Sequence, residues 1–252
     1  MFAAVVVQLA KDKPDGHSIL LATSSTNAAA PHLYAKLGFD PLTDFTPVIA
    51  LCEIPNVMVV PTKSPWNSLQ ELVAAAKKDP GQYTYGSAGI GGSQHLAGAQ
   101  FKTTSGADIR HVPYKGGAQA ITDLIGGQVD VMFNGMVATY PHVKAGKIKL
   151  IAISSAKRNA QMPDTPTVAE SLPGFLTGSF QGLLAPAGTP KAVIDKVHAE
   201  VQRIAALPEV RERLNTLGAE PSAMSPADFG QWLKSEIPAM AKIVKDEKIT
   251  VE

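Results

Sequence analysis

The sequence predicts an α/β protein in which helices cover a mainly parallel sheet. Three observations lead to this expectation: strand-like and helix-like segments alternate over the middle of the chain, the loops between them are short, and the strand-like segments are runs of Val, Ile, Leu and Met with few charges. Alternation of this kind is typical of sheets flanked by helices, whose strands are buried on both faces.

The predicted elements follow in a regular order. A first helix ends before Pro14 and Gly16, a short strand covers Ser18–Ala22, and two apolar runs lead to Pro61. The next helix has Ser68 and Glu71 in capping-box spacing. Strands and helices then alternate at 82–89, 93–104, 107–114, 116–127, 129–133, 137–146 and 147–155. After a proline-rich connection and an apolar run at 179–186, three helices are expected, opening at Pro190, Pro208 and Pro226.

Two apolar runs that end in proline suggest a division into two domains. They end at Pro61 and Pro186 and bracket a self-contained βα block. We therefore expect a discontinuous outer domain, residues 1–60 and 186–252, and an inserted inner domain, residues 61–185. A single continuous sheet fits the sequence equally well.

Composition excludes several classes of function. The 252-residue chain carries a net charge of +1, has 6% aromatic residues and contains no cluster of Lys and Arg, so nucleic-acid binding is not expected. The single cysteine, Cys52, excludes an intramolecular disulfide and a cysteine-only metal site. The six histidines lack ligand spacing, so no metal is expected, and no motif indicates a cofactor.

The segment from Tyr85 to Gly98, YGSAGIGGSQHLAG, is the most informative loop. A phosphate-binding P-loop would need lysine where Gly92 stands, a dinucleotide fingerprint would need glycine at Gln94, and neither Ser87 nor Ser93 lies in G-x-S-x-G. A glycine loop between a strand and a helix still allows close approach to the free N–H groups of the helix start, with Ser93 as its expected N-cap. This arrangement suits a carboxylate or another small anion. The alternative is a tight turn before a capped helix, with no ligand.

Polar residues also follow three other predicted strands. Thr23–Thr26 form a hydroxyl-rich turn, Tyr114 and Lys115 precede two glycines, and Asn134 follows the strand Val129–Phe133. Because ligands of open α/β sheets bind beyond the carboxyl ends of strands, these segments together predict a polar, nearly uncharged pocket. A hydrolase with Ser87 or Ser93 as nucleophile and His95 as base is the enzymatic alternative, although no carboxylate can be assigned to orient the histidine.

Six segments carry a resemblance to a known family: PDGHSILLATSSTNAAAPHLY, YGSAGIGGSQHLAG, HVPYKGGAQAITDLIGGQVDVMF, KAGKIKLIAISSAKR, PDTPTVAE and GLLAPAGTP. In this order they resemble the substrate-binding proteins of tripartite tricarboxylate transporters, the Bug or TctC family. The resemblance covers essentially the whole chain.

The resemblance implies a type II periplasmic-binding-protein fold, with two α/β domains joined by a two-crossing hinge that close on a ligand. It implies a non-enzymatic periplasmic protein that delivers a small carboxylate (a di- or tricarboxylate, an amino acid or an aromatic acid) to membrane permease subunits. Signalling to a membrane sensor is an alternative role for the same fold. By position, the ligand-binding residues would be Thr23, Ser24, Ser25, Thr26, Ser87, Ala88, Gly89, Ser93, His95, Asn134, Tyr114 and Lys115.

The chain departs from the family pattern at its N-terminus. The family opens with a signal peptide, a first strand and a loop rich in proline and glycine, whereas Met1 here stands just before the first predicted helix. We therefore expect an outer domain that lacks its first strand. The apolar surface left by that loss would favour a homodimer.

Overall fold

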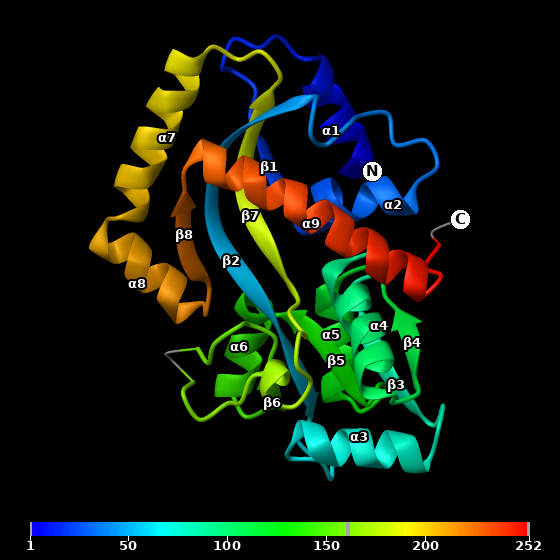
Figure 1. Cartoon of the computed structure of the whole chain (residues 1–252). Helices are drawn as coiled ribbons and strands as arrows, with labels where there is room; N and C mark the ends of the chain where they lie inside the picture. Colours follow the sequence, from blue (N-terminus) through cyan, green and yellow to red (C-terminus); the bar gives the residue numbers. More distant parts are fainter. Residues whose placement is uncertain (1, 160–161, 251–252) are drawn as a thin grey trace. The chain divides into compact units, whose positions relative to one another are not determined.

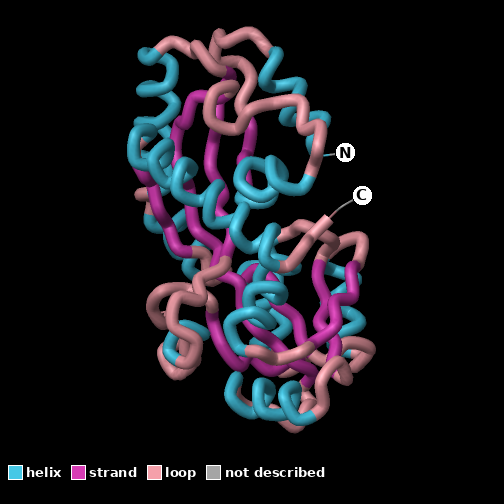
Figure 2. The backbone as a smooth tube through the Cα atoms, turned by 45° about the vertical axis from the view of Figure 1, so that its right-hand side comes forward, coloured by secondary structure: helices cyan, strands magenta, loops and turns pink. Residues whose placement is uncertain are grey.

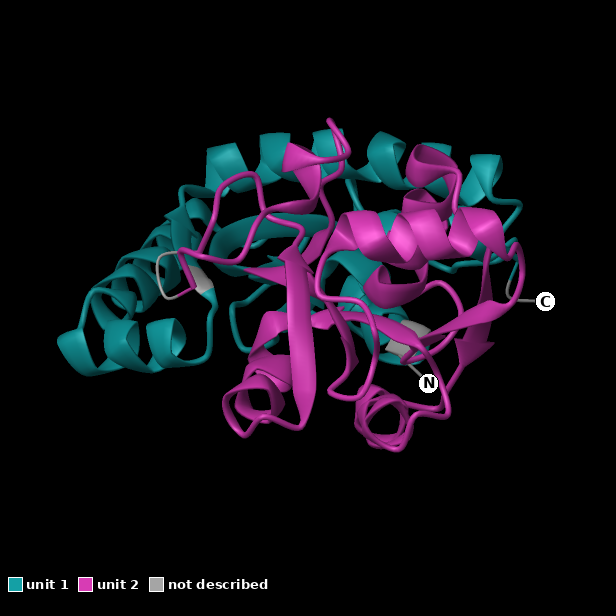
Figure 3. Cartoon of the chain, turned by 90° about the horizontal axis from the view of Figure 1, so that it is seen from below, with its two compact units in different colours: residues 1–53, 180–252 teal, residues 54–179 magenta. Residues whose placement is uncertain are grey.

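The computed structural model describes residues 2–159 and 162–250 and divides the chain into two compact units (Figure 3). Unit 1 comprises Met1–Glu53 and Phe180–Glu252, and unit 2 comprises Ile54–Ser179. Each unit combines strands and helices, as the α/β prediction requires (Figures 1 and 2). The predicted domain boundaries fall six or seven residues beyond these divisions, and the outer and inner roles of the domains stay predictions.

Unit 1 contains part or all of four strands together with five helices and a π-helical turn (Figure 1). Its elements are α1 (Phe2–Lys11), β1 (Leu20–Thr23), the π-helical turn η1 (Ser25–Ala29), α2 (Ala30–Leu33), the first part of β2 (Phe45–Pro61), β7 (Gly178–Pro186), α7 (Lys191–Ala205), α8 (Pro208–Thr216), β8 (Glu220–Met224) and α9 (Pro226–Asp246). The sheet has the order β1-β7-β2-β8, in which β1 runs antiparallel to β7 and β8 antiparallel to β2.

Unit 2 is the βα block that the sequence predicts, but its sheet is mixed, with two parallel and two antiparallel strand pairs, whereas a mainly parallel sheet was expected. Its elements are α3 (Leu69–Lys78), β3 (Tyr83–Ser87), α4 (Ser93–Ser105), β4 (Ile109–Pro113), α5 (Gly117–Ile125), β5 (Val131–Gly135), α6 (Met136–Lys144), β6 (Ile148–Ile153) and the 3₁₀ turn η2 (Val168–Glu170). The sheet order is β6-β2-β5-β3-β4. β3 is parallel to both β4 and β5, whereas β2 is antiparallel to β5 and β6.

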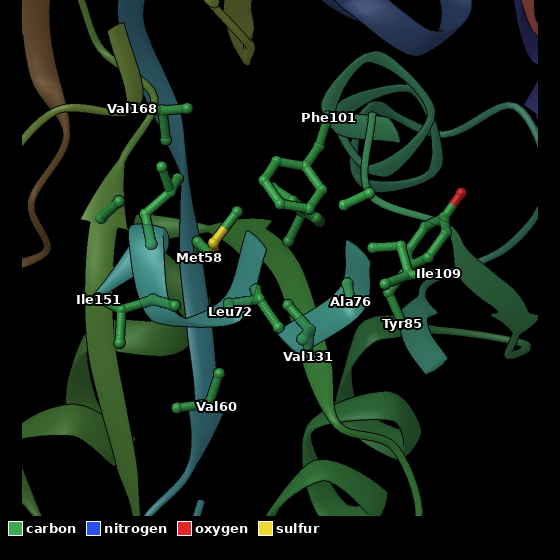
Figure 4. Close-up of a cluster of buried hydrophobic side chains, with 14 of the residues drawn as sticks. Met58, Val60, Leu72, Ala76, Tyr85, Phe101, Ile109, Val131, Ile151 and Val168 are labelled. Carbon is green, nitrogen blue, oxygen red and sulfur yellow. The ribbon is translucent and has the colours of Figure 1, made fainter. Parts of the chain in front are cut away.

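Helices cover both faces of the unit 2 sheet, and the alternation of β2 shows how. Met58 and Val60 pack with Leu72 of α3 and Phe101 of α4, and Figure 4 shows these side chains converging on one face of the strands. Val57 and Val59 point to the opposite face and pack with residues of α5 and α6. Successive strand side chains face opposite ways, so a strand covered on both faces is apolar at consecutive positions.

Among the described residues of unit 1, apolar side chains form two clusters. Ala50, Leu184 and Phe229 belong to a cluster that also includes α1 and α9, whereas the neighbouring positions Ile49 and Ala185 pack with Ile194 of α7. The same alternation therefore holds here. None of the helices described in residues 2–159 and 162–250 is long and apolar enough to cross a membrane.

Strand β2 departs from the predicted pair of short runs, because it continues through Pro55. Asn56, the residue after this proline, forms backbone hydrogen bonds with residues outside the neighbouring strands. Its N–H donates to the Thr177 carbonyl, and its carbonyl accepts from the Ser154 N–H. Proline has no N–H to donate, so it is tolerated where the ladder is irregular. The proline therefore lies within one 17-residue strand, not between two strands.

Three predicted boundaries were also wrong. Thr23 lies in β1 and the following residues enter η1, so the expected hydroxyl-rich turn is largely helical. Asn134 lies within β5, where it pairs with Val57, because a neighbouring strand extends β5 beyond its apolar run. Gly92, not Ser93, is the N-cap of α4.

Candidate functional site

Three helices of unit 2 begin at one edge of its sheet, and each has a glycine as its N-cap. α4 follows β3 with Gly92 as N-cap, α5 follows β4 with Gly116, and α6 follows β5 with Gly135. Glycine has no side chain that could accept a hydrogen bond from the first turn, so none of the three helices has a side-chain cap. Because β3, β4 and β5 are parallel, all three helix starts follow the carboxyl ends of their strands.

Among the described residues, three other helical segments have a side-chain cap, whereas α7 and α8 begin after Pro190 and Leu207 and have none. Ser68 accepts from the Glu71 N–H at α3, Thr167 from the Glu170 N–H at η2, and Ser225 from the Asp228 N–H at α9. Free N–H groups and the positive end of the helix dipole attract anions. At α4, α5 and α6 the N-cap glycine places no side chain over the helix start, so a small anion can approach the N–H groups of the first turn.

The loop between β3 and α4 is held in a conformation that favours glycine. Gly89 has a φ of 138° and Gly91 a φ of 78°, values that L side chains rarely adopt. A Cβ on Gly89 would also lie 3.3 Å from the Tyr114 carbonyl oxygen. The Tyr114 N–H donates to the Ser87 carbonyl at 3.0 Å, so β3 and the start of the next loop are tied together.

Ser87 is completely buried at the end of β3. Its Oγ lies 2.7 Å from His111 Nε2, accepts from the Gly89 N–H at 3.1 Å and lies 3.0 Å from the Gly89 carbonyl. The hydroxyl therefore holds the glycine loop. A nucleophile must reach its substrate, and this one is enclosed by the loop itself.

His95 accepts a hydrogen bond from the loop. The Gly91 N–H donates to His95 Nδ1 at 3.0 Å, and the ring stacks on His111 with 3.9 Å between centroids. Burial lowers the pKa of each histidine to about 4, with a smaller contribution to both from Lys102 and to His111 from His95. The predicted hydrolase pair of Ser87 and His95 is therefore not formed, because Ser87 bonds to His111 instead.

Asn134 is almost fully buried and is fixed at both ends of its amide. Its Oδ1 accepts from Gln94 Nε2 at 3.2 Å, and its Nδ2 donates to Thr139 Oγ1 at 2.9 Å. A Cβ built on Gly117 would lie 3.6 Å from Asn134 Oδ1 and 3.9 Å from Ala88 Cβ. The structure thus brings Ala88, Asn134 and the first residue of α5 together.

The other predicted residues of unit 2 are less tightly placed. Tyr114 is half-buried, and burial together with Asp123 raises its pKa. Lys115 is exposed, and Ser93 is half-buried as the first residue of α4. Within unit 2, the structure therefore gathers Ser87, Ala88, Gly89, His95 and Asn134, with Tyr114 joined through its backbone.

In unit 1, the predicted hydroxyl segment binds mainly to itself. The Thr26 N–H donates to Thr23 Oγ1 at 3.4 Å, and the Thr23 N–H donates to Thr26 Oγ1 at 3.2 Å. Ser24 is buried and accepts from the Phe180 N–H at 3.3 Å, while Ser25 is half-buried in η1. These bonds fix the segment within unit 1, and its ligand role stays a prediction.

The residues described by the structure offer no grouping of three His, Cys, Asp or Glu side chains that could hold a metal ion. Cys52 is buried, and burial raises the pKa of its thiol, with a smaller effect from Glu53. The chemistry of the unit 2 site is thus that of backbone N–H groups and neutral polar side chains.

Sequence reasoning missed three residues of this site: His111, Gln94 and Gly117. His111 lies in β4 and reaches Ser87 only because β3 and β4 pair in register, Tyr85 beside His111. Gln94 follows the glycines within the quoted loop, and Gly117 opens a helix after a second pair of glycines. The repeated glycine before a helix was the available signal.

Comparison with known protein families shows which family this chain belongs to. The family model for the tripartite tricarboxylate transporter family receptor, TctC, matches residues 3–249. The chain belongs to the TctC family. This TctC protein is similar to a UPF0065 protein of Pseudomonas sp. (strain P51) encoded in the tcbD-tcbE intergenic region, with 33% identity over 96% of this chain and 72% of the relative. It is also similar to BugT of Bordetella pertussis, with 30% identity over 94% of this chain and 73% of the relative.

Solved structures give the same relationship and support the predicted periplasmic-binding-protein fold. An R. palustris protein solved with adipate is 32% identical to this chain and superposes with a TM-score of 0.91. The match covers 99% of this chain and 84% of the R. palustris chain. The periplasmic binding protein BugD shares 35% identity and a TM-score of 0.87, over 98% and 83% of the two chains. MatC from Rhodopseudomonas palustris, solved with bound malate, shares 32% identity and a TM-score of 0.85, over 96% and 84%. The chain is therefore a solute-binding protein of the TctC family.

Proposed function

We propose that this protein is a periplasmic binding protein that captures a small carboxylate for a tripartite tricarboxylate transporter. The observation that carries the proposal is the set of three helix starts in unit 2, each with a glycine N-cap and no side-chain cap, at the carboxyl edge of parallel strands. A carboxylate accepts several N–H bonds at once, and it needs no cationic side chain where helix dipoles face it.

The relatives support the chemical class of the ligand. One solved neighbour holds adipate and another holds malate, and both are carboxylates. Transfer of that class to this chain is part of the proposal, and so is the permease partner, which the family description supports. The binding loop in unit 2 is Ser87–Gly89 with Asn134, and Ser93, His95, Tyr114 and Lys115 surround it.

Asn134→Asp tests the site. The change preserves the size of the side chain and the acceptor for Gln94; it removes the Nδ2 donor to Thr139 and places a negative charge beside the proposed carboxylate. Repulsion between like charges at contact distance should weaken binding by about 1.4–2.8 kcal/mol, roughly ten- to a hundredfold in Kd. Isothermal titration with adipate, malate, succinate, citrate, aspartate and benzoate measures the effect.

Gln128→Glu is the matched control, because it makes the same change of charge at an exposed position before β5, whereas Asn134 lies near the other end of that strand. It should leave Kd unchanged. Failure of the parent protein to bind any of these carboxylates would contradict the function. Equal binding by the parent and Asn134→Asp would contradict the location of the site.

A further inference from the structure

Two stacked histidines lie beneath the glycine loop, and each restrains one of its glycines. His95 accepts directly from the Gly91 N–H at 3.0 Å. His111 acts through Ser87, whose Oγ lies 2.7 Å from His111 Nε2 and accepts from the Gly89 N–H at 3.1 Å. The two rings are nearly parallel, with 8° between their planes and 3.9 Å between their centroids.

The hydrogen bond at His95 fixes its tautomer. Because Nδ1 accepts from Gly91, the ring is neutral and its single proton lies on Nε2. A proton added at Nδ1 would face the Gly91 N–H, and two donors cannot bond to each other. The loop conformation therefore depends on His95 staying neutral.

The surroundings of the pair favour neutral rings. Tyr85 of β3 stacks on His111 at 4.8 Å between centroids, and its hydroxyl donates to the His95 carbonyl at 3.4 Å. Lys102, further along α4, is the charged group that acts on both rings, and it repels a second positive charge. Burial and this repulsion both lower the pKa of the two imidazoles.

We propose that His95 and His111 are positioning residues for the solute site: as a neutral stacked pair they hold the glycine loop ready for ligand, and protonation of the pair releases it. The proposal rests on the proposed function, because it concerns the same loop. Neither histidine needs to touch the ligand. Affinity for solute should then decline when the medium becomes acidic enough to protonate the pair.

The first test needs no ligand. In ¹⁵N-labelled protein, NMR should show His95 as the Nε2–H tautomer at pH 7, and both rings should titrate well below the ordinary range for histidine. As the rings take up protons, the Gly89 and Gly91 amide resonances should move. Their hydrogen exchange, corrected for its intrinsic pH dependence, should accelerate about tenfold or more. Ordinary titration near pH 6.5, or amides that do not respond to it, would overturn the proposal.

Substitutions separate positioning from general stability. His95→Asn keeps an acceptor oxygen near the place of Nδ1 and cannot titrate, and His111→Gln keeps an amide near the place of Nε2. In the double variant the Gly91 amide should not respond to acid as it does in the parent, because neither replacement can take up a proton in this range. His95→Ala leaves the Gly91 N–H without its acceptor and should weaken binding about tenfold or more.

The two failures can be told apart. A parent protein that binds no carboxylate removes the proposed function, while the NMR titration still decides whether the histidines control the loop. A double variant that responds to acid as the parent does would overturn the role of the pair, whatever the ligand. Equal binding by His95→Ala and the parent would do the same.

Discussion

Gly98 shows how closely α4 approaches the sheet beneath it. A Cβ at this position would lie 2.1 Å from Tyr85 Cε2 and 2.5 Å from Tyr85 Cζ, and Tyr85 is fully buried. In an isolated helix, Gly→Ala stabilises by about 1 kcal/mol. Here the overlap with a buried ring should reverse the sign.

Gly98→Ala should therefore destabilise the protein by about 1–3 kcal/mol, the usual cost of overpacking a core. Urea unfolding, followed by circular dichroism, measures this change in the free energy of unfolding. Gly126→Ala is the matched control, because its Cβ would lie at an ordinary 3.5 Å from the Thr122 carbonyl and its φ of −74° suits alanine. A stable Gly98→Ala protein would show that Tyr85 can move.

At this scale, it could be predicted that several residues of the candidate site lie together, whereas their role in binding a ligand stays a prediction. Ser87, Gly89 and Asn134 follow from rules about strand ends and glycine loops. His111 could not be found in this way, because its role depends on strand register: Tyr85 pairs with His111, and the Ser87 hydroxyl is within reach only in that register. The role of His95 also changes, since its Nδ1 is occupied by the loop.

At the scale of elements, the 3₁₀ turn η2 is held by one ion pair and a capping box. Glu170 accepts from Arg158 Nε at 2.8 Å and Arg158 Nη2 at 2.6 Å, and also from the Thr167 N–H at 3.0 Å. The bond from Arg158, followed by the one from Thr167, lowers the pKa of Glu170 from 4.5 to about 2. This fixes the turn in the proline-rich connection before β7.

The direction of the pH effect follows from this shift. A carboxyl with a lowered pKa in the folded state contributes stability above pH 4.5, and the contribution is lost as the pH falls towards 2. Glu170→Gln should therefore unfold at lower urea concentration than the parent at pH 6, and the difference should shrink steadily between pH 4.5 and 2.5. Glu212→Gln, in exposed α8, controls for the loss of one negative charge. A difference that stays constant with pH would contradict the role of the pair.

The predicted elements differ most from the structure where long-range pairing decides. Strand β8 (Glu220–Met224) was not predicted, because EPSAM has no apolar pattern and the strand forms only by pairing with β2. Asn134 was placed after its strand for a similar reason, since pairing with Val57 extends β5. Helices depend on local periodicity and caps, and their predicted positions in unit 2 agree with the structure to within a few residues.

At the scale of the whole molecule, unit 2 is one continuous segment, Ile54–Ser179, whereas unit 1 needs two. The segment contains every strand of its sheet, including the end of β2, and both apolar clusters that cover that sheet. A fragment of residues 54–179 should therefore fold by itself. Dispersed NMR amide resonances and a cooperative thermal transition would show this, and a fragment of residues 62–179, which lacks β2, should remain unfolded.

The ends of this segment lie against each other, since a Cβ on Gly178 would be 2.9 Å from the Ile54 carbonyl oxygen. Unit 2 is inserted between the two chain segments of unit 1. With respect to unit 1 it is therefore a long loop, and the fold of unit 2 holds the two ends of this loop together. Closing a flexible loop of this length would cost about 4 kcal/mol in chain entropy. Once unit 2 has folded, that cost has been met before β2 and β7 come together in unit 1. We therefore expect the inserted segment to fold first and to bring the two distant parts of unit 1 close together.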